Sequence, residues 1–328
     1  DCEDRKDSHP FPVEIQRNLL GAGTITKIIA GRYISAVLNE QGQVYTFGFN
    51  RYGQLGRAEN VGTELPSWLP QPIAGMRAGE KVVDIAAGDH HLLLRTDQGR
   101  VLSVGLNRHG QLGYCASAGS WQANFAPTEI LHDRPISSMA AGRRHSLLLT
   151  QDGNILAFGS NAYGQLGTEQ GRFERDSVSC SPQLVDLQAV NCLHGACSRI
   201  SKVAAGRWFS LLLSESGQLL GFGSNQQGQL LGPDEKIGSP TQVDLSVFGR
   251  GSVVDLSAGS QHTVLLVASG WFDSSELWLF GSNGEAQLDV HPTPSSYDNQ
   301  YVRSRKDPCS FLGADECPHY RILSVSAG

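Results

Sequence analysis

The chain has 328 residues, 40% of them hydrophobic, with 38 glycines and 14 prolines. This composition allows a large core and suits many short strands joined by tight turns, and no apolar run is long enough for a membrane helix. The formal net charge of −6 argues against attraction of nucleic acid by the surface as a whole, although it leaves room for a local basic patch.

Cysteine content and sequons bear on the compartment. Seven cysteines is an odd number, which disfavours a complete disulfide framework, and no Asn-x-Ser/Thr sequon occurs. Both features favour an intracellular protein, cytoplasmic or nuclear. The charged start DCEDRKDSHPFP is unlike a signal peptide, but the chain has no initiator Met, so this start says little about targeting.

One pattern recurs along the chain and is clearest at 141–167, AGRRHSLLLTQDGNILAFGSNAYGQLG. Further copies cover 30–56, 87–113 and 205–232, and a looser one covers 258–289. Self-similarity of this kind marks a repeat architecture, because each copy is one supersecondary unit that buries its apolar face only against neighbours. We therefore predict that residues 1–328 form a single repeat domain.

Each copy predicts four strands. An apolar strand such as 82–87 runs into Ala-Gly, and after a two-residue loop a second strand such as 91–95 leads to a glycine that supplies positive φ at a hairpin. A third strand leads to Asn-x-x-Gly-Gln-Leu-Gly, a corner in which Asn turns its side chain onto nearby backbone. We expect the outer fourth strand to begin at a proline, as at Pro127 or Pro240, where no ladder bond is lost. Four antiparallel strands make one propeller blade.

The residues AGxxHS, LLLT, DG, FG, SN and GQLG at 141–167 resemble the regulator of chromosome condensation repeat. The resemblance implies an all-β fold, a β-propeller with seven blades when complete. The repeats are expected at about 25–80, 81–135, 136–199, 200–252 and 253–321. Residues 322–328 open a sixth, so five full repeats stand between two partial ones. Members of this family act as a nucleotide exchange factor that docks on chromatin, as ligase or kinase modules, as plant UV-B photoreceptors or as scaffolds.

Departures from the family pattern narrow the function. The histidine of the repeat is present at His91, His145 and His262 but replaced by Ile34 and Phe209, which alters a ring of positions on which an exchange factor could rely. We interpret these histidines as structural rather than catalytic, because one repeat position seldom forms one active site.

Two further classes are disfavoured. The photoreceptors need a tryptophan cluster, and only Trp208 lies near such a loop. No phosphate-binding GxxxxGK[ST], HExxH or GxSxG motif occurs, so we expect no enzyme activity and no cofactor.

The cysteines leave alternatives open. Cys192, His194 and Cys197, with Cys180 nearby, form a weak candidate zinc site whose spacing matches no common module. A local disulfide or free thiols are the other interpretations. Cys115 has no partner that the sequence identifies.

Strand alternation assigns each connection to a face. The Ala-Gly loops and the Asn-led corners emerge on one face, which we call the loop face. It carries Arg32, Arg51, Asp89, Arg108, Arg143, Arg144, Arg207 and Trp208. This excess of arginine is either ordinary solvated charge or a docking face for an acidic partner.

The opposite face carries the insertions of three consecutive repeats. Their candidate partner-binding residues are His194, Trp271, Phe272, Asp273, Arg305 and Lys306. Exposed aromatic residues suit an interface, although Trp271 could equally fold back onto its own blade.

Together these features predict a non-enzymatic scaffold or adaptor that presents propeller loops to partner proteins. The alternative is a guanine nucleotide exchange factor for a small GTPase. Nucleic-acid binding and membrane insertion are disfavoured.

Overall fold

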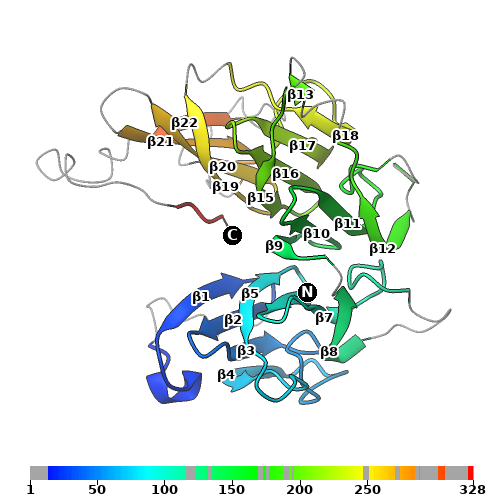
Figure 1. Ribbon diagram of the computed structural model, residues 1–328, viewed down its shortest axis with the longest axis vertical. Helices are drawn as coiled ribbons and strands as arrows, with labels where there is room; N and C mark the ends of the chain where they lie inside the picture. The colour runs from blue at the N-terminus through cyan, green and yellow to red at the C-terminus, as the bar shows by residue number, and fades with distance from the viewer. Residues whose placement is uncertain are drawn as a thin grey trace, which may run out of the picture.

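The computed structural model describes residues 14–115, 123–131, 134–168, 173–174, 177–187, 192–193, 196–246, 251–269, 274–284, 288, 302–306 and 324–327. Five four-stranded antiparallel sheets follow one another along the chain and form the blades of a propeller (Figure 1). Within each blade the strands pair in chain order, which confirms the predicted all-β propeller with four-stranded blades.

Every blade has the same four-strand composition. Blade 1 holds β1 (Ile25–Ala30), β2 (Ile34–Asn39), β3 (Val44–Phe49) and β4 (Pro66–Pro72). Blade 2 holds β5 (Val82–Ala87), β6 (His91–Thr96), β7 (Val101–Leu106) and β8 (Ala123–Leu131). Blade 3 holds β9 (Ile136–Ala141), β10 (His145–Thr150), β11 (Ile155–Ser160) and β12 (Val178–Leu184). Blade 4 holds β15 (Ile200–Ala205), β16 (Phe209–Ser214), β17 (Leu219–Ser224) and β18 (Lys236–Gln242). Blade 5 holds β19 (Ser252–Ala258), β20 (His262–Ser269), β21 (Ser274–Gly281) and β22 (Val302–Lys306).

Two short elements lie outside the blades. The 3-10 helix η1 (Arg17–Leu20) precedes blade 1, and a hairpin of β13 (Cys192–Leu193) and β14 (Ala196–Cys197) lies in the connection between blades 3 and 4. The C-terminal segment lies against blade 5, where the backbone N–H of Val325 donates to Asp255 and that of Ala327 to Ser257.

The hydrophobic core lies between blades rather than within one sheet. Each buried cluster joins two neighbours: Leu55 of blade 1 lies in one cluster with Ile85 of blade 2, and Phe209 of blade 4 lies in one with Phe280 of blade 5. Because a blade buries its faces only against the next blade, stability depends on neighbour-to-neighbour contacts, as in other repeat proteins.

The Ala-Gly glycines allow this close approach at the centre. A Cβ atom built on Gly31 would overlap the carbonyl oxygen of Gly88, one on Gly88 that of Gly142, and one on Gly142 that of Gly206. None of these glycines has positive φ. Glycine is therefore required here by contact between blades rather than by backbone conformation.

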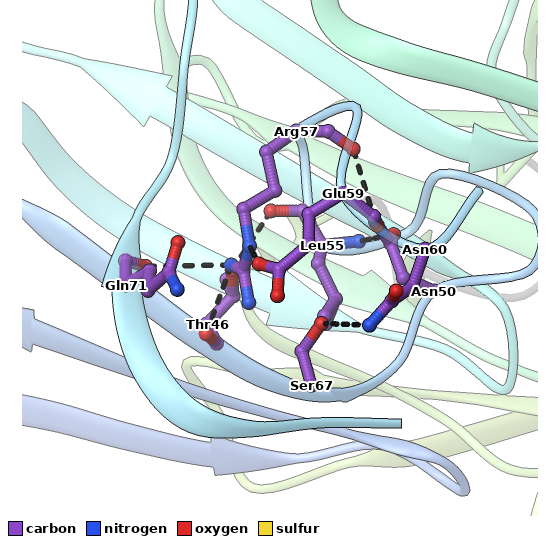
Figure 2. Close-up of polar contacts among 8 residues, drawn as sticks. All are labelled: Thr46, Asn50, Leu55, Arg57, Glu59, Asn60, Ser67 and Gln71. Carbon is purple, nitrogen blue, oxygen red and sulfur yellow. Dashed lines mark hydrogen bonds and ion pairs between the residues drawn. The ribbon is translucent and has the colours of Figure 1, made fainter. Parts of the chain in front are cut away.

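The Asn-led corner is held by its asparagine, as the sequence predicts. In blade 1 the Asn50 carboxamide accepts from the N–H of Leu55 and donates to the carbonyls of Arg57 and Glu59 (Figure 2). The same acceptor bond to leucine recurs from Asn107, Asn161, Asn225 and Asn283. The fifth repeat thus keeps this bond although its corner glycines are replaced.

Arg57 adds a contact specific to blade 1. Its side chain is 7% exposed, donates to both oxygens of Thr46, and pairs with Glu59 at 3.1 Å (Figure 2). Burial lowers the pKa of this guanidinium, and Glu59 partly offsets that effect.

The prediction that a proline begins the outer strand holds for β4, which starts at Pro66, but is wrong for the two prolines named as examples. Pro127 and Pro240 lie inside β8 and β18, where the pairing register with the neighbouring strand shifts. A bulge on an edge strand leaves a residue unpaired, so a proline without an N–H is accommodated there. Pro70 of β4 and Pro182 of β12 occupy equivalent bulges.

Candidate functional site

Two of the three repeated histidines, His91 and His145, join neighbouring blades. Nε2 of His91 lies 2.9 Å from Oγ of Ser146 in the next blade, and Nε2 of His145 lies 3.0 Å from Oγ of Ser210. Each serine hydroxyl donates to the backbone carbonyl of the corner glutamine of the preceding blade, Gln111 or Gln165. Since the hydroxyl proton is committed there, the histidine donates from Nε2.

These histidines are buried and uncharged. Burial lowers the pKa of His91 and of His145 to about 3. In blade 5 the Thr263 hydroxyl donates to the backbone carbonyl of Gln229 in blade 4 in the same way. Blade 4 itself carries the buried Phe209 at the histidine position. The contacts assign this repeat position to blade assembly, and we call these His, Ser and Gln residues the inter-blade layer.

A cavity of about 460 Å³ lies at the centre of the ring and is lined by Ala-Gly loops of all five blades. The residue after each glycine forms part of its lining: Arg32, Asp89, Arg143, Arg207 and Ser260. Asp89 lies between two arginines of neighbouring blades, 3.3 Å from Nε of Arg143 and 3.7 Å from Arg32. The Asp89 carboxylate thus forms ion pairs with two arginines that line the central cavity.

Three arginine side chains lie over the ring of Trp208. The guanidinium carbons of Arg143, Arg144 and Arg207 lie 4.9, 5.2 and 6.0 Å from its ring. We call these four residues the Arg–Trp cluster. Burial lowers the pKa of Arg143 and of Arg144, and repulsion by neighbouring arginines adds to the effect, while Asp89 opposes it. The cluster is therefore a partly buried positive centre and not a set of solvated side chains.

A second aromatic group lies between blades 1 and 2. His90 stacks on Tyr33 and meets Tyr52 edge-on, with ring centroids 5.1 Å apart in both pairs. Burial lowers the pKa of His90, Asp89 raises it, and nearby arginines lower it further. Arg51 lies over Tyr52 at 5.8 Å and forms an ion pair with Glu64.

The sequence-predicted loop-face residues therefore fall into distinct groups. Asp89, Arg143, Arg144, Arg207 and Trp208 lie together, with Arg32 at their edge through Asp89. Arg108 acts electrostatically on Arg144, whereas Arg51 belongs to the aromatic group of blades 1 and 2.

Sequence reasoning missed Tyr163 and Lys236. The ring of Tyr163 lies 5.3 Å from that of Trp208, and Nζ of Lys236 lies 5.0 Å from Tyr163. The signal was available in part: Tyr52 and Tyr163 stand two residues after the corner asparagine, and their partners His90 and Trp208 stand two residues after the next Ala-Gly. This corner-to-loop offset pairs variable residues of adjacent blades.

The cysteine hypotheses need one correction. Cys180, considered a soft ligand, forms a disulfide with Cys115, for which no partner was predicted; their Cα atoms are 4.8 Å apart. This bond joins the corner of blade 2 to the outer strand of blade 3. Cys192 and Cys197 lie opposite one another in the β13–β14 hairpin, and His194 lies outside the described residues.

The opposite-face candidates are only partly placed. Trp271, Phe272 and Asp273 lie outside the described residues, between the eight-residue strands β20 and β21. Arg305 and Lys306 pair through their backbone with Trp278 and Leu277 on the edge of blade 5. Within the described part of the chain, no group of three or more potential metal ligands occurs.

Comparison with known proteins identifies the family. The model of the RCC1-like domain matches residues 2–328. The chain belongs to the RCC1-like domain family. The human "Probable E3 ubiquitin-protein ligase HERC6" is 32% identical over 301 residues, covering 90% of this chain and 27% of that protein. The Xenopus laevis "Regulator of chromosome condensation" is 29% identical over 279 residues, covering 82% of this chain and 64% of that protein.

A solved structure supports the same fold. Human WBSCR16 superposes with a TM-score of 0.74 at 21% identity, covering 93% of this chain and 72% of that one. This RCC1-like chain spans about a quarter of its HERC6 relative and less than two thirds of the amphibian protein. No helix among its described residues is both long and apolar enough to cross a bilayer.

Proposed function

We propose that this RCC1-like propeller is a non-enzymatic protein-interaction module whose loop face binds an acidic surface of a partner protein. The Arg–Trp cluster carries the proposal, because three guanidinium groups gather at one tryptophan, while Asp89 is the acid that pairs with Arg143. Tryptophan and arginine are the residues most enriched in interface hot spots. Guanidinium groups stacked on an aromatic ring keep their in-plane donors for carboxylates.

The test is partner capture by the full-length protein and by charge-reversed variants. Arg143→Glu with Arg144→Glu should abolish capture of proteins that the wild type retains, because both substitutions reverse the charge over Trp208. Arg134→Glu is the matched control, since Arg134 is exposed and precedes β9 on the opposite face. Capture that survives the double reversal, or that is lost equally with Arg134→Glu, contradicts the proposal.

Guanine nucleotide exchange is the competing function that the family resemblance permits. It is tested by the release of fluorescently labelled GDP from a panel of small GTPases, with and without this protein. Strong acceleration that disappears with the double reversal would assign the loop face to a GTPase. Unchanged release across the panel supports the interaction module.

A further inference from the structure

A second cavity of the loop face lies between blades 2, 3 and 4. It measures about 450 Å³ and we call it the corner pocket. Its main lining residues are Arg108, Arg144, Tyr163, Phe173, Trp208 and Lys236. Arg108 and Tyr163 come from Asn-led corners, Arg144 and Trp208 from Ala-Gly loops, Phe173 from the connection between β11 and β12, and Lys236 is the first residue of β18. The pocket is therefore built by several repeats together.

The aromatic residues hold the cations in place. Tyr163 and Trp208 pack at 5.3 Å, and the guanidinium carbon of Arg144 lies 5.2 Å from the Trp208 ring. Nζ of Lys236 lies 5.0 Å from the ring of Tyr163 and 5.8 Å from that of Phe173. A cation held over a ring loses less side-chain freedom when it binds an anion, which favours binding.

Positive charge dominates the corner pocket. The described lining includes Arg108, Arg144 and Lys236 and no carboxylate. Burial lowers the pKa of Arg144, and repulsion between Arg144 and Arg108 lowers it further, while Asp89 opposes the effect. Close cations relieve that repulsion most by sharing a multiply charged anion.

We propose that the corner pocket binds a phosphorylated serine or threonine side chain of a partner protein, with the phosphate held by Arg108, Arg144 and Lys236. A phosphate monoester carries a charge of about −1.5 to −2 and three acceptor oxygens, which match three cationic donors better than one carboxylate does. This proposal rests on the proposed function of the loop face and names the ligand class of one site within it.

The test uses three fluorescein-labelled peptide libraries that are degenerate except at the centre, which is phosphoserine, serine or glutamate. The wild type should bind the phosphoserine library at least tenfold more tightly than the other two, as measured by fluorescence anisotropy. Arg144→Gln and Lys236→Gln should each remove most of that preference, whereas Arg134→Gln should keep it. Thermal unfolding of each variant checks that the fold is intact.

Three outcomes overturn the proposal. These are equal binding of the serine library, equal binding of the glutamate library, and a phosphoserine preference that survives both pocket substitutions. The result also separates the two proposals. If phosphatase treatment leaves partner capture unchanged while Arg143→Glu with Arg144→Glu abolishes it, the phosphate site is wrong and the acidic-surface interface stands.

Discussion

The inter-blade layer and the Arg–Trp cluster are adjacent in sequence and differ in almost every property. His145 follows Arg144 directly, and Phe209 follows Trp208. The histidine is fully buried, uncharged and bonded to the next blade, while the arginine is partly exposed and stacked on a tryptophan of that blade. One residue step along the loop therefore separates a buried position that contacts the next blade from a partly exposed position on the loop face.

The comparison teaches where stability and recognition reside. Contacts between neighbouring blades stabilise the ring, because each blade buries its faces only against its neighbours. Side chains that differ between blades gather on the loop face, where the proposed function assigns them to partner specificity. Substitutions of residues that contact the neighbouring blade should therefore lower the stability of the fold. Substitutions in the Arg–Trp cluster should weaken partner binding.

The largest expected effect on stability comes from the Cys115–Cys180 disulfide, which links blades 2 and 3 across 65 residues. In the chain-entropy model, closing a loop of this length stabilises the fold by about 4 kcal/mol. Cys115→Ser should lower the free energy of unfolding by about that amount in oxidising buffer, as measured by urea denaturation. With reductant present, the variant and the wild type should unfold at the same urea concentration; a difference that persists there would refute the assignment.

Gly142→Ala should have the next largest effect, because the new methyl group would overlap the Gly206 carbonyl and the His145 ring. Overpacking at such a site costs about 3 kcal/mol. Gly284→Ala is the matched control, since no atom lies within 4 Å of its Cβ position. Calorimetry should show a clearly lower Tm for Gly142→Ala and an unchanged Tm for Gly284→Ala. Equal Tm values for the two variants would show that close contact between blades does not require glycine at this position.

The buried histidines predict a loss of stability in acid. Both have a folded pKa of about 3, below the unfolded value of about 6.5, so the unfolded chain binds more protons as the pH falls between these values. Their stabilising effect is complete above pH 6.5 and declines below it, by about 2 kcal/mol per histidine at pH 5.

Replacing the two histidines tests how much of the pH dependence of stability they cause. His145→Phe copies the residue that blade 4 carries at this position, and it should remove one histidine's share of the acid sensitivity. The double variant with His91→Phe should remove both shares. Denaturation at pH 7, 6 and 5 tests this, and an unchanged pH dependence in the double variant would show that the two histidines are not the source.

The blade architecture could be predicted because its causes are local. Asn50, Gly42 and their equivalents act within one repeat at fixed offsets, so sequence spacing reveals them. The Cys115–Cys180 bond and the Tyr163–Trp208 contact join different blades, and their partners depend on how neighbouring repeats pack. Pro240 was misplaced because a bulge in strand pairing has no sign in hydrophobic periodicity.

The candidate site likewise combines features that the sequence could predict with contacts that it could not. Its individual members, Arg143, Arg144, Arg207 and Trp208, could be chosen as variable loop residues on one predicted face. Their convergence on one ring could not, because the geometry that brings blades 3 and 4 together also sets which loop residues meet.

The smallest effect on stability is expected in the Arg–Trp cluster. Arg143→Gln removes an ion pair with Asp89 whose two side chains are 21% and 17% exposed, together with a cation–π contact. Such contacts are worth about 1 kcal/mol or less, and removing one arginine also relieves repulsion from Arg207. A double-mutant cycle with Asp89→Asn should give a coupling energy of the same size by urea denaturation. A loss of about 3 kcal/mol would place Arg143 among the residues that assemble the propeller, and the division between the two regions would then fail at this position.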